Sequence, residues 1–269
     1  YRTQLEYTGD RYGVEVEHLA VGDQFNPEVG FLRRRDIRRS FGKMRFSPRP
    51  RSIDWVRRFS WTGSLAYVEN MAGRLDTRER AGEFAIELQN SDRAYATYTD
   101  TYEFLPRPFD IAQNVQLPVG GYEYNNVKAG YELGQNRRIA GNLAAEFGTF
   151  YNGTKTGFSV SRGRTAISPQ LAFEPTYTVN WVDLDQGSFT THLIGTRAIY
   201  TMNPRMFVSA LVQYSSTSGL VGANVRLRWE YRPGSELFIV YNDEQDVRDG
   251  RSVAPVRSFI IKVNRLFRM

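Results

Sequence analysis

The sequence contains no cysteine and two histidines, His18 and His192. The first absence excludes disulfides and thiolate metal sites, and the second leaves little imidazole for catalysis. No apolar run reaches the roughly 18 residues that a membrane-spanning helix needs, so a helical membrane protein is excluded. Neither a Gly-x-Ser-x-Gly nor a His-Glu-x-x-His sequence occurs. We therefore expect no cofactor and no enzymatic activity.

The chain is rich in residues that favour strands and tight turns. Its 269 residues include 16 Tyr, 17 Phe, 4 Trp and 23 Gly, and aromatic side chains suit a pleated surface. The mean hydropathy is −0.48, but a low average does not exclude a membrane barrel, whose alternating strands average out. The 35 basic and 29 acidic residues are interspersed and give a net charge of +6.

Apolar and polar residues alternate with a period of two along most of the chain, which is typical of half-buried strands. Val225, Leu227, Trp229 and Tyr231, for example, alternate with Asn224, Arg226, Arg228 and Glu230. The pattern predicts an all-β antiparallel meander of about fifteen strands in one region, 1–269, without a linker. The predicted strands are 2–8, 11–20, 37–46, 53–69, 73–89, 93–105, 121–134, 138–151, 154–163, 169–183, 188–201, 205–215, 223–232, 236–243 and 256–268.

Turn residues between the runs predict two hairpin registers. A two-residue turn at Gly9-Asp10 would place Tyr7 opposite Tyr12. A three-residue loop at 233–235 would place Trp229 opposite Ile239. In both hairpins apolar side chains then face apolar side chains.

Strand length favours a closed transmembrane β-barrel over a soluble sandwich or propeller. Most predicted strands exceed ten residues, whereas soluble strands cluster at about 5–6 and tilted membrane strands need about 9–11. In a barrel the apolar face meets lipid and the charged face lines a wet lumen. The predicted lipid-facing residues are Trp55, Trp61, Trp181, Leu227 and Trp229, and the predicted lumen-facing residues are Arg226, Arg228, Glu230, Lys128 and Glu132.

The lengths of the connections between strands alternate, and this alternation predicts the orientation of the chain in the membrane. Counted from the N-terminus, the odd connections are mostly short, whereas the even ones include 21–36, 106–121, 216–222 and 242–255. Outer-membrane barrels combine short periplasmic turns with long external loops. The C-terminus is then periplasmic, and the odd strand count predicts at least one upstream strand and an even total of about 16 or more. The chain would thus be a fragment of a longer barrel.

The last segment resembles the C-terminal assembly signal of bacterial outer-membrane proteins. Its apolar face consists of Phe259, Ile261, Val263 and Phe267. It departs from the usual pattern because Arg268 and Met269 follow the final aromatic residue.

Two stretches resemble a known family. They are FNPEVGFLRR at 25–34, and LRWEYRPGSEL at 227–237 followed by Val240-Tyr241-Asn242. This family of bacterial envelope proteins places a family-9-type carbohydrate-binding module before a long C-terminal domain of unknown function, taken to be an outer-membrane barrel. The resemblance covers nearly all 269 residues but only the C-terminal part of such a protein. The binding module itself lies outside this sequence, so no sugar-binding residue carries over.

Three local patterns favour ordinary structure over a binding site. Residues 148–155 are similar to a phosphate-binding loop but lack its Gly-Lys-Ser/Thr ending, so we interpret them as a hairpin turn. The acidic stretches 183–187 and 243–246 lack full calcium-loop spacing, so solvated outer loops are preferred about five to one. We also interpret His18 and His192 as wall residues rather than ligands.

The sharpest charge cluster consists of arginines, a residue suited to bidentate contacts with phosphate or carboxylate. It could bind anions such as lipopolysaccharide phosphates, or act as a plug loop. The alternative is a structural loop whose arginines pair with carboxylates such as Glu28 and Asp36. The cluster comprises Arg33, Arg34, Arg35, Arg38 and Arg39.

These patterns predict a bacterial outer-membrane barrel that acts as a pore or transport element with a polar lumen. The alternative is a plugged barrel that anchors a carbohydrate-binding module or an envelope complex, and a third possibility is a soluble all-β binding protein. Expected partners are outer-membrane lipid, lipopolysaccharide, the barrel-assembly machinery and an envelope complex. Nucleic acid is not expected, because the aromatic residues lie on the face opposite the charges.

Overall fold

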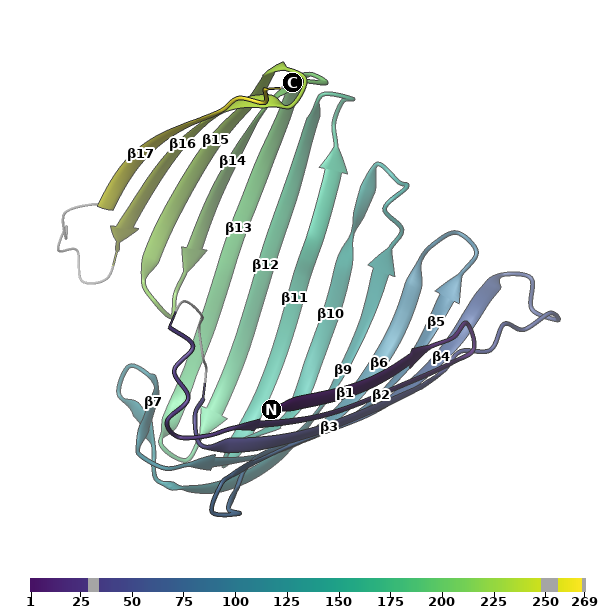
Figure 1. Cartoon of the computed structure of the whole chain (residues 1–269), viewed down its shortest axis with the longest axis vertical. Helices are drawn as coiled ribbons and strands as arrows, with labels where there is room; N and C mark the ends of the chain where they lie inside the picture. The colour runs from purple at the N-terminus through teal and green to yellow at the C-terminus, as the bar shows by residue number, and fades with distance from the viewer. Residues whose placement is uncertain (29–33, 248–255, 268–269) are drawn as a thin grey trace. The chain divides into compact units, whose positions relative to one another are not determined.

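The computed structural model describes residues 1–28, 34–247 and 256–267. Figure 1 shows long strands that follow one another in chain order. Within the described ranges the regular structure is all-β, and no helix there is long and apolar enough to cross a membrane.

Fifteen strands form one antiparallel sheet in which each pairs with its neighbours in sequence, apart from a small hairpin between β6 and β9. This confirms the predicted antiparallel meander of about fifteen strands. The strands are β1 (Arg2–Thr8), β2 (Tyr12–Val21), β3 (Ile37–Phe46), β4 (Val56–Asn70), β5 (Leu75–Leu88), β6 (Arg93–Leu105), β7 (Phe109–Ala112), β8 (Val115–Leu117), β9 (Gly120–Leu133), β10 (Ile139–Phe150), β11 (Gly153–Ala166), β12 (Leu171–Leu184), β13 (Gly187–Asn203), β14 (Met206–Ser215), β15 (Leu220–Arg232), β16 (Ser235–Asp246) and β17 (Val256–Asn264).

Besides shifts of up to four residues at other strand ends, three differences from the predicted strands affect the interpretation of the sequence. The connection 106–119 contains the separate hairpin β7–β8, which the sequence pattern did not indicate. Trp55 precedes β4 instead of lying on it. The acidic stretch 243–246, expected as a solvated loop, belongs to β16, which continues to Asp246.

Both predicted hairpin registers are wrong by two residues. Tyr7 lies opposite Val14 because the first loop has four residues, closed by a bond from Gly9 N–H to the Tyr12 carbonyl. Trp229 lies opposite Leu237, and a bulge between Glu230 and Arg232 takes up the difference. Since side chains alternate with a period of two, a shift of two leaves every residue on its predicted face.

The chain consists of two compact units that both draw on strands β9 to β13. Unit 1 comprises Tyr1–Tyr131, Ala145–Thr156 and Trp181–Phe189. Unit 2 comprises Glu132–Ala144, Gly157–Asn180 and Thr190–Met269.

In unit 1, a row of aromatic rings lies on the apolar face of the sheet. Trp61 of β4 is 44% exposed. Its ring centroid lies 5.9 Å from that of Phe46 and 5.1 Å from that of Phe84, and Tyr12 stacks on Phe46 at 5.3 Å. Such ring pairs contribute about 0.5–1.5 kcal/mol each beyond the area they bury. These ring contacts stabilise the aromatic row, which lies near the odd-numbered connections.

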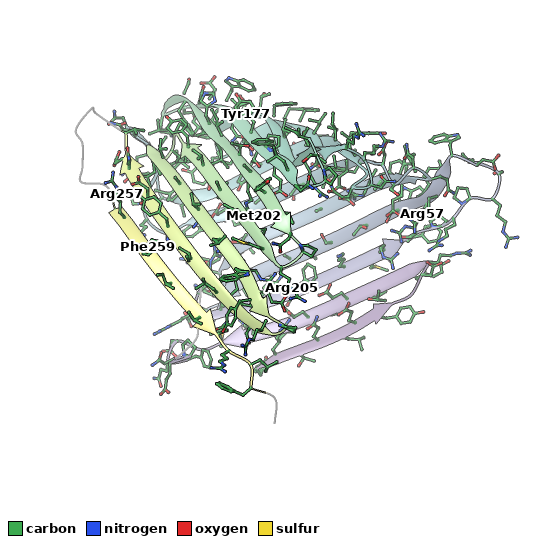
Figure 2. All side chains as sticks on the ribbon, turned by 90° about the horizontal axis from the view of Figure 1, so that it is seen from above. Arg57, Tyr177, Met202, Arg205, Arg257 and Phe259 are labelled. Carbon is green, nitrogen blue, oxygen red and sulfur yellow. The ribbon has the colours of Figure 1, made fainter. Side chains whose placement is uncertain are left out.

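In unit 2, cross-strand pairing builds a continuous apolar face over β14 to β17. Val208 lies opposite Leu227, Leu227 opposite Ile239, and Ile239 opposite Ile261. The next row of directly opposed residues along these strands ends on β17 at Phe259, which is 64% exposed and is labelled in Figure 2. Directly opposed apolar pairs of this kind stabilise the sheet.

Each apolar face ends in ion pairs near the even-numbered connections. In unit 1, Arg38 Nε lies 3.0 Å from Glu69 Oε1. Arg78 lies 3.5 Å from Asp100. In unit 2, Arg257 Nε lies 3.4 Å from Asp243 Oδ1. The apolar band is therefore bounded by charge at the end of the strands where the longer connections lie.

Strand β10 approaches β9 closely at Gly148, which has no side chain. A Cβ atom there would overlap the carbonyl oxygen of Asn125, whereas a Cβ on Gly63 would meet nothing within 4 Å. We expect Gly148→Ala to lower the free energy of unfolding by about 1–3 kcal/mol through overpacking. Gly63→Ala, the matched control, should change it by less than about 0.5 kcal/mol. Urea titration monitored by tryptophan fluorescence would measure both, and equal effects would contradict the close approach.

Candidate functional site

In unit 1, the polar face of the sheet carries a buried carboxylate held by two arginines. Glu17 of β2 is 6% exposed. It accepts a hydrogen bond of 2.7 Å from Arg2 Nε on β1 and another from Arg39 on β3. Two partially exposed guanidinium groups thus compensate one buried negative charge, as a buried carboxylate requires.

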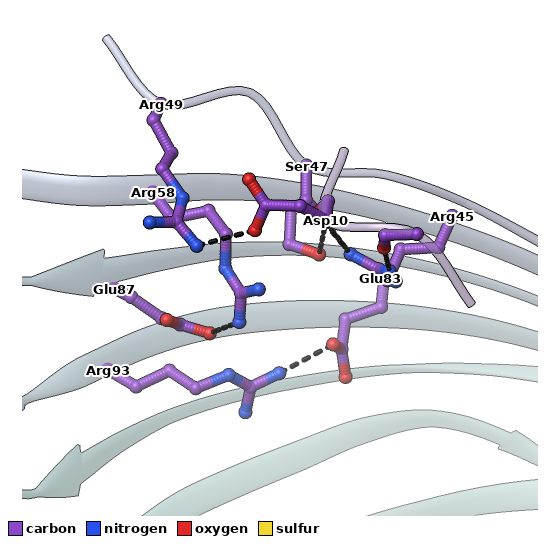
Figure 3. Close-up of polar contacts among 10 residues, drawn as sticks. Asp10, Arg45, Ser47, Arg49, Arg58, Glu83, Glu87 and Arg93 are labelled. Atoms are coloured by element: carbon purple, nitrogen blue, oxygen red, sulfur yellow. Dashed lines mark hydrogen bonds and ion pairs between the residues drawn. The ribbon is translucent and has the colours of Figure 1, made fainter. Parts of the chain in front are cut away.

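The same face continues with arginine–carboxylate pairs across β4, β5 and β6, as Figure 3 shows. Arg58 of β4 pairs with Glu87 of β5. Arg93 of β6 pairs at 2.5 Å with Glu83 of β5 and lies over the Tyr95 ring at 4.8 Å. Each pair joins two adjacent strands, so the face remains strongly polar while its charges are compensated locally.

In unit 2, the polar face combines ion pairs with amide and hydroxyl groups. Arg228 Nε donates to Glu236 at 2.9 Å. Asn224 donates to Asn242, which in turn donates to Ser258 at 2.8 Å. This hydrogen-bonded row runs across β15, β16 and β17.

At the opposite end from the short turns, hairpin β7–β8 packs on the polar face of unit 1. Leu117 is fully buried, in a cluster with Leu105, Val115, Val182 and Leu184. These side chains come from β6, β8 and β12. This apolar cluster, on an otherwise charged face, fixes the hairpin against the strands.

A tyrosine beside this cluster hydrogen-bonds to a carboxylate. Tyr151, in the short connection between β10 and β11, donates from its hydroxyl to Glu103 Oε2 at 2.9 Å. Burial first, and then the Glu103 charge, raise the pKa of Tyr151 above its ordinary value. The hydroxyl, already protonated at neutral pH, is held more firmly as a hydrogen-bond donor to Glu103.

The structure separates the members of the predicted arginine cluster. Arg38 pairs with Glu69 on the apolar face, whereas Arg39 pairs with Glu17 on the polar face. Arg34 donates to Thr77 Oγ1 at 3.0 Å, and Arg35 is exposed. Arg33 lies outside the described residues. Among the residues that the structure describes, the carboxylate partners of Arg38 and Arg39 are Glu69 and Glu17, not the suggested Glu28 and Asp36.

The other predicted site residues fall on the two faces as follows. Arg226, Arg228 and Glu230 share the face of Asn224, and Lys128 and Glu132 share the face of Tyr124 on β9. Leu227 and Trp229 lie on the opposite face of β15, and Trp61 and Trp181 are exposed. Phe259, Ile261 and Val263 share one face of β17, while Phe267 follows the strand and is exposed.

The residues considered as metal ligands have other contacts. His18 Nδ1 lies 3.0 Å from Ser40 Oγ, and the His192 ring stacks near Tyr177 at 6.4 Å. Asp183 accepts a hydrogen bond from Ser188, and Asp185 accepts one from Asn152. In the part of the chain that the structure describes, no three His, Asp or Glu side chains form a group that could hold a metal ion. Residues 148–155 form the predicted hairpin between β10 and β11.

Glu17 and the β7–β8 hairpin were missed by sequence reasoning. The alternation of Val115, Gln116 and Leu117 after Asn114 is too short to predict a hairpin from the sequence. Glu17 offered no signal, because its two arginine partners are 15 and 22 residues away in sequence.

Comparison with known proteins gives no family. No protein-family model matches the chain, and no curated protein matches it. Eight chains among solved structures match. One, described as "Asymmetric conductivity of engineered proteins", is 12% identical with a TM-score of 0.26, and the match covers 97% of this chain and 100% of that chain. A TM-score this low carries no argument about function.

Leu117 provides the test of the hairpin cluster. We expect Leu117→Ala to lower the free energy of unfolding by about 2–5 kcal/mol, because it leaves a cavity in a fully buried site. Phe109→Ala, on the exposed strand of the same hairpin (46% exposed), should cost much less. Urea titration would compare the two, and similar losses would show that the hairpin is not anchored through Leu117.

Proposed function

We propose that this chain is part of a bacterial outer-membrane β-barrel whose polar face lines a passage for small solutes. One observation carries the proposal: long strands present an exposed apolar face on one side and paired ionised groups on the other. The main-sheet strands run from 7 residues in β1 to 17 in β13. In a soluble sandwich the apolar face would be covered by a second layer, yet Trp61, Trp181 and Phe259 are 44%, 50% and 64% exposed.

The distribution along the strands supports a membrane-facing band. On β4, Trp61 belongs to the aromatic row and Glu69 to the ion pairs. Glu69 lies eight positions after Trp61, which corresponds to about 27 Å along the strand at roughly 3.4 Å per residue. For a strand tilted by about 40°, this is roughly 21 Å of membrane thickness, compared with the apolar band of about 25 Å in outer-membrane barrels. The spacing between the aromatic row and the ion pairs therefore supports a membrane-facing band.

The polar face supports passage rather than a solid core. Arg58, Glu87, Arg93 and Glu83 remain partially exposed within their pairs. A face that carries both signs in compensated pairs interacts with polar solutes without a strong preference for one sign of charge. Hairpin β7–β8, anchored through Leu117, would narrow this passage from the side of the longer connections.

The same hairpin favours a second function, a closed barrel that serves as an anchor. The apolar cluster holds a connecting segment against the polar face, where a plug would also lie. The anchored element would then be an envelope complex or, following the sequence resemblance, a carbohydrate-binding module. In both proposals the C-terminus is periplasmic, lipid and lipopolysaccharide surround the apolar face, and the barrel-assembly machinery recognises the β17 face.

Conductance in planar bilayers separates the two functions. We expect the purified protein to form ion-conducting channels, and deletion of residues 109–117 to increase the single-channel conductance, because the hairpin narrows the passage. Heat-modifiable gel mobility would verify that each variant is folded. Folded protein that forms no channel, with or without the hairpin, would eliminate passage and leave the anchor.

Two adjacent residues of β15 test the assignment of the faces. Leu227→Arg should lower the free energy of unfolding in lipid by roughly 2–4 kcal/mol, because a lipid-facing charge near the midplane is costly. Arg226→Gln, the matched control on the opposite face, should cost far less. Urea titration in lipid vesicles measures both, and equal effects would argue against lipid contact.

A further inference from the structure

A pocket lined by charged side chains of both signs lies on the polar face of unit 2. Its volume is about 500 Å³. Arg197 on β13 lies opposite Leu211 on β14, which lies opposite Asn224, so the pocket is on the same face as the amide row. Its lining includes Glu132, Arg164, Glu174, Arg197 and Leu211.

The two arginines of this pocket keep most of their hydrogen-bond donors available. Arg164 is exposed and has no hydrogen-bond or ion-pair partner among the described residues. Arg197 has one ion-pair partner there, Glu174, at 3.9 Å and without a hydrogen bond. Elsewhere on the polar face, Arg58 and Arg228 donate directly to carboxylates. A guanidinium group with free donors favours a bidentate contact with a carboxylate.

The pocket also carries acceptors of the opposite charge. Glu174 is 35% exposed in its side chain and lies within 3.9 Å of Arg197, and Glu132 completes a set of two carboxylates and two guanidinium groups. The pocket is therefore neutral overall but has its positive and negative groups side by side. A ligand with a single charge would satisfy one sign and leave the other uncompensated in the contact.

A second pocket shares Leu211 and extends along the polar face of unit 2. Its volume is about 420 Å³, and its lining includes Gln213, Ser215, Asn224 and Asn242. These amide and hydroxyl groups offer neutral hydrogen bonds next to the charged pocket. Together the two pockets offer a charged end and a neutral polar extension, within the size range of small-molecule sites.

We infer that the pocket of Arg164, Glu174 and Arg197 binds a zwitterion of the amino-acid class. Its carboxylate contacts Arg197 and Arg164, its ammonium group contacts Glu174, and its substituent lies along the second pocket. The binding site needs only the polar face of unit 2. Its role as a station for solutes in transit rests on the proposed passage.

Isothermal titration calorimetry of the purified, folded protein in detergent tests the inference. The probe is L-alanine, and L-lactate is the matched analogue in which a hydroxyl replaces the ammonium group. We expect saturable binding of L-alanine and at least tenfold weaker binding of L-lactate. Equal affinity for the two, or no saturable binding of L-alanine, would overturn the inference.

Single substitutions locate the site. Arg197→Gln should weaken L-alanine binding about tenfold, which corresponds to about 1.4 kcal/mol. Arg164→Gln, at an exposed position, should weaken binding in the same direction. Arg226→Gln is the matched control, since Arg226 lies on the same face but outside the pocket. Unchanged binding in Arg197→Gln, with heat-modifiable mobility verifying the fold, would overturn the location.

The outcome for binding is independent of the outcome for passage. Calorimetry in detergent reports on the pocket even if the protein forms no channel in bilayers. Binding of L-alanine without conductance would retain the pocket and remove the passage. Conductance without binding of L-alanine would retain the passage and overturn the inferred pocket.

Discussion

The structure depends on the pairing of extended backbone segments, which fixes the direction of every side chain. In an antiparallel ladder, the backbone groups of one strand are satisfied by its neighbours, and successive side chains point to opposite faces. The sequence alternates with the same period, so pairing alone collects apolar residues such as Leu227, Ile239 and Ile261 into one surface. The ionisable residues are collected on the other surface by the same constraint.

The ionised surface then has to be stabilised within itself. Arg58 and Glu87 join β4 to β5, Glu83 and Arg93 join β5 to β6, and Glu17 is held between two arginines from flanking strands. Exposed pairs contribute little stability individually, about 0–1 kcal/mol. Their larger effect is to reduce the repulsion between like charges that lie close together on one surface. In the pocket near Arg197, the one ion pair that the structure describes is 3.9 Å long, so a charged ligand can form closer contacts there than the protein's own side chains do.

The strands were predictable because alternation is a local property that each segment carries by itself. Strand β3 was predicted with its observed bounds, 37–46. The two hairpin registers could not be predicted in this way, because they depend on contacts outside the turn. In the first hairpin, Arg45 donates to the carbonyl oxygens of Gly9 and Asp10 and holds the four-residue loop. The partners of Glu17 and the lining of the Arg197 pocket come from strands far apart in sequence, so no local pattern marks them.

The two-residue difference at the first hairpin bears on how such a sheet can change during evolution. Four residues rather than two connect Thr8 to Gly13, yet Leu5 and Tyr7 stay on the apolar face. Insertions or deletions of an even number of turn residues therefore conserve the division between the faces, whereas a single-residue change would turn a whole strand over. Homologous chains should accordingly vary in turn length by pairs of residues, with odd changes accompanied by a compensating bulge such as that between Glu230 and Arg232.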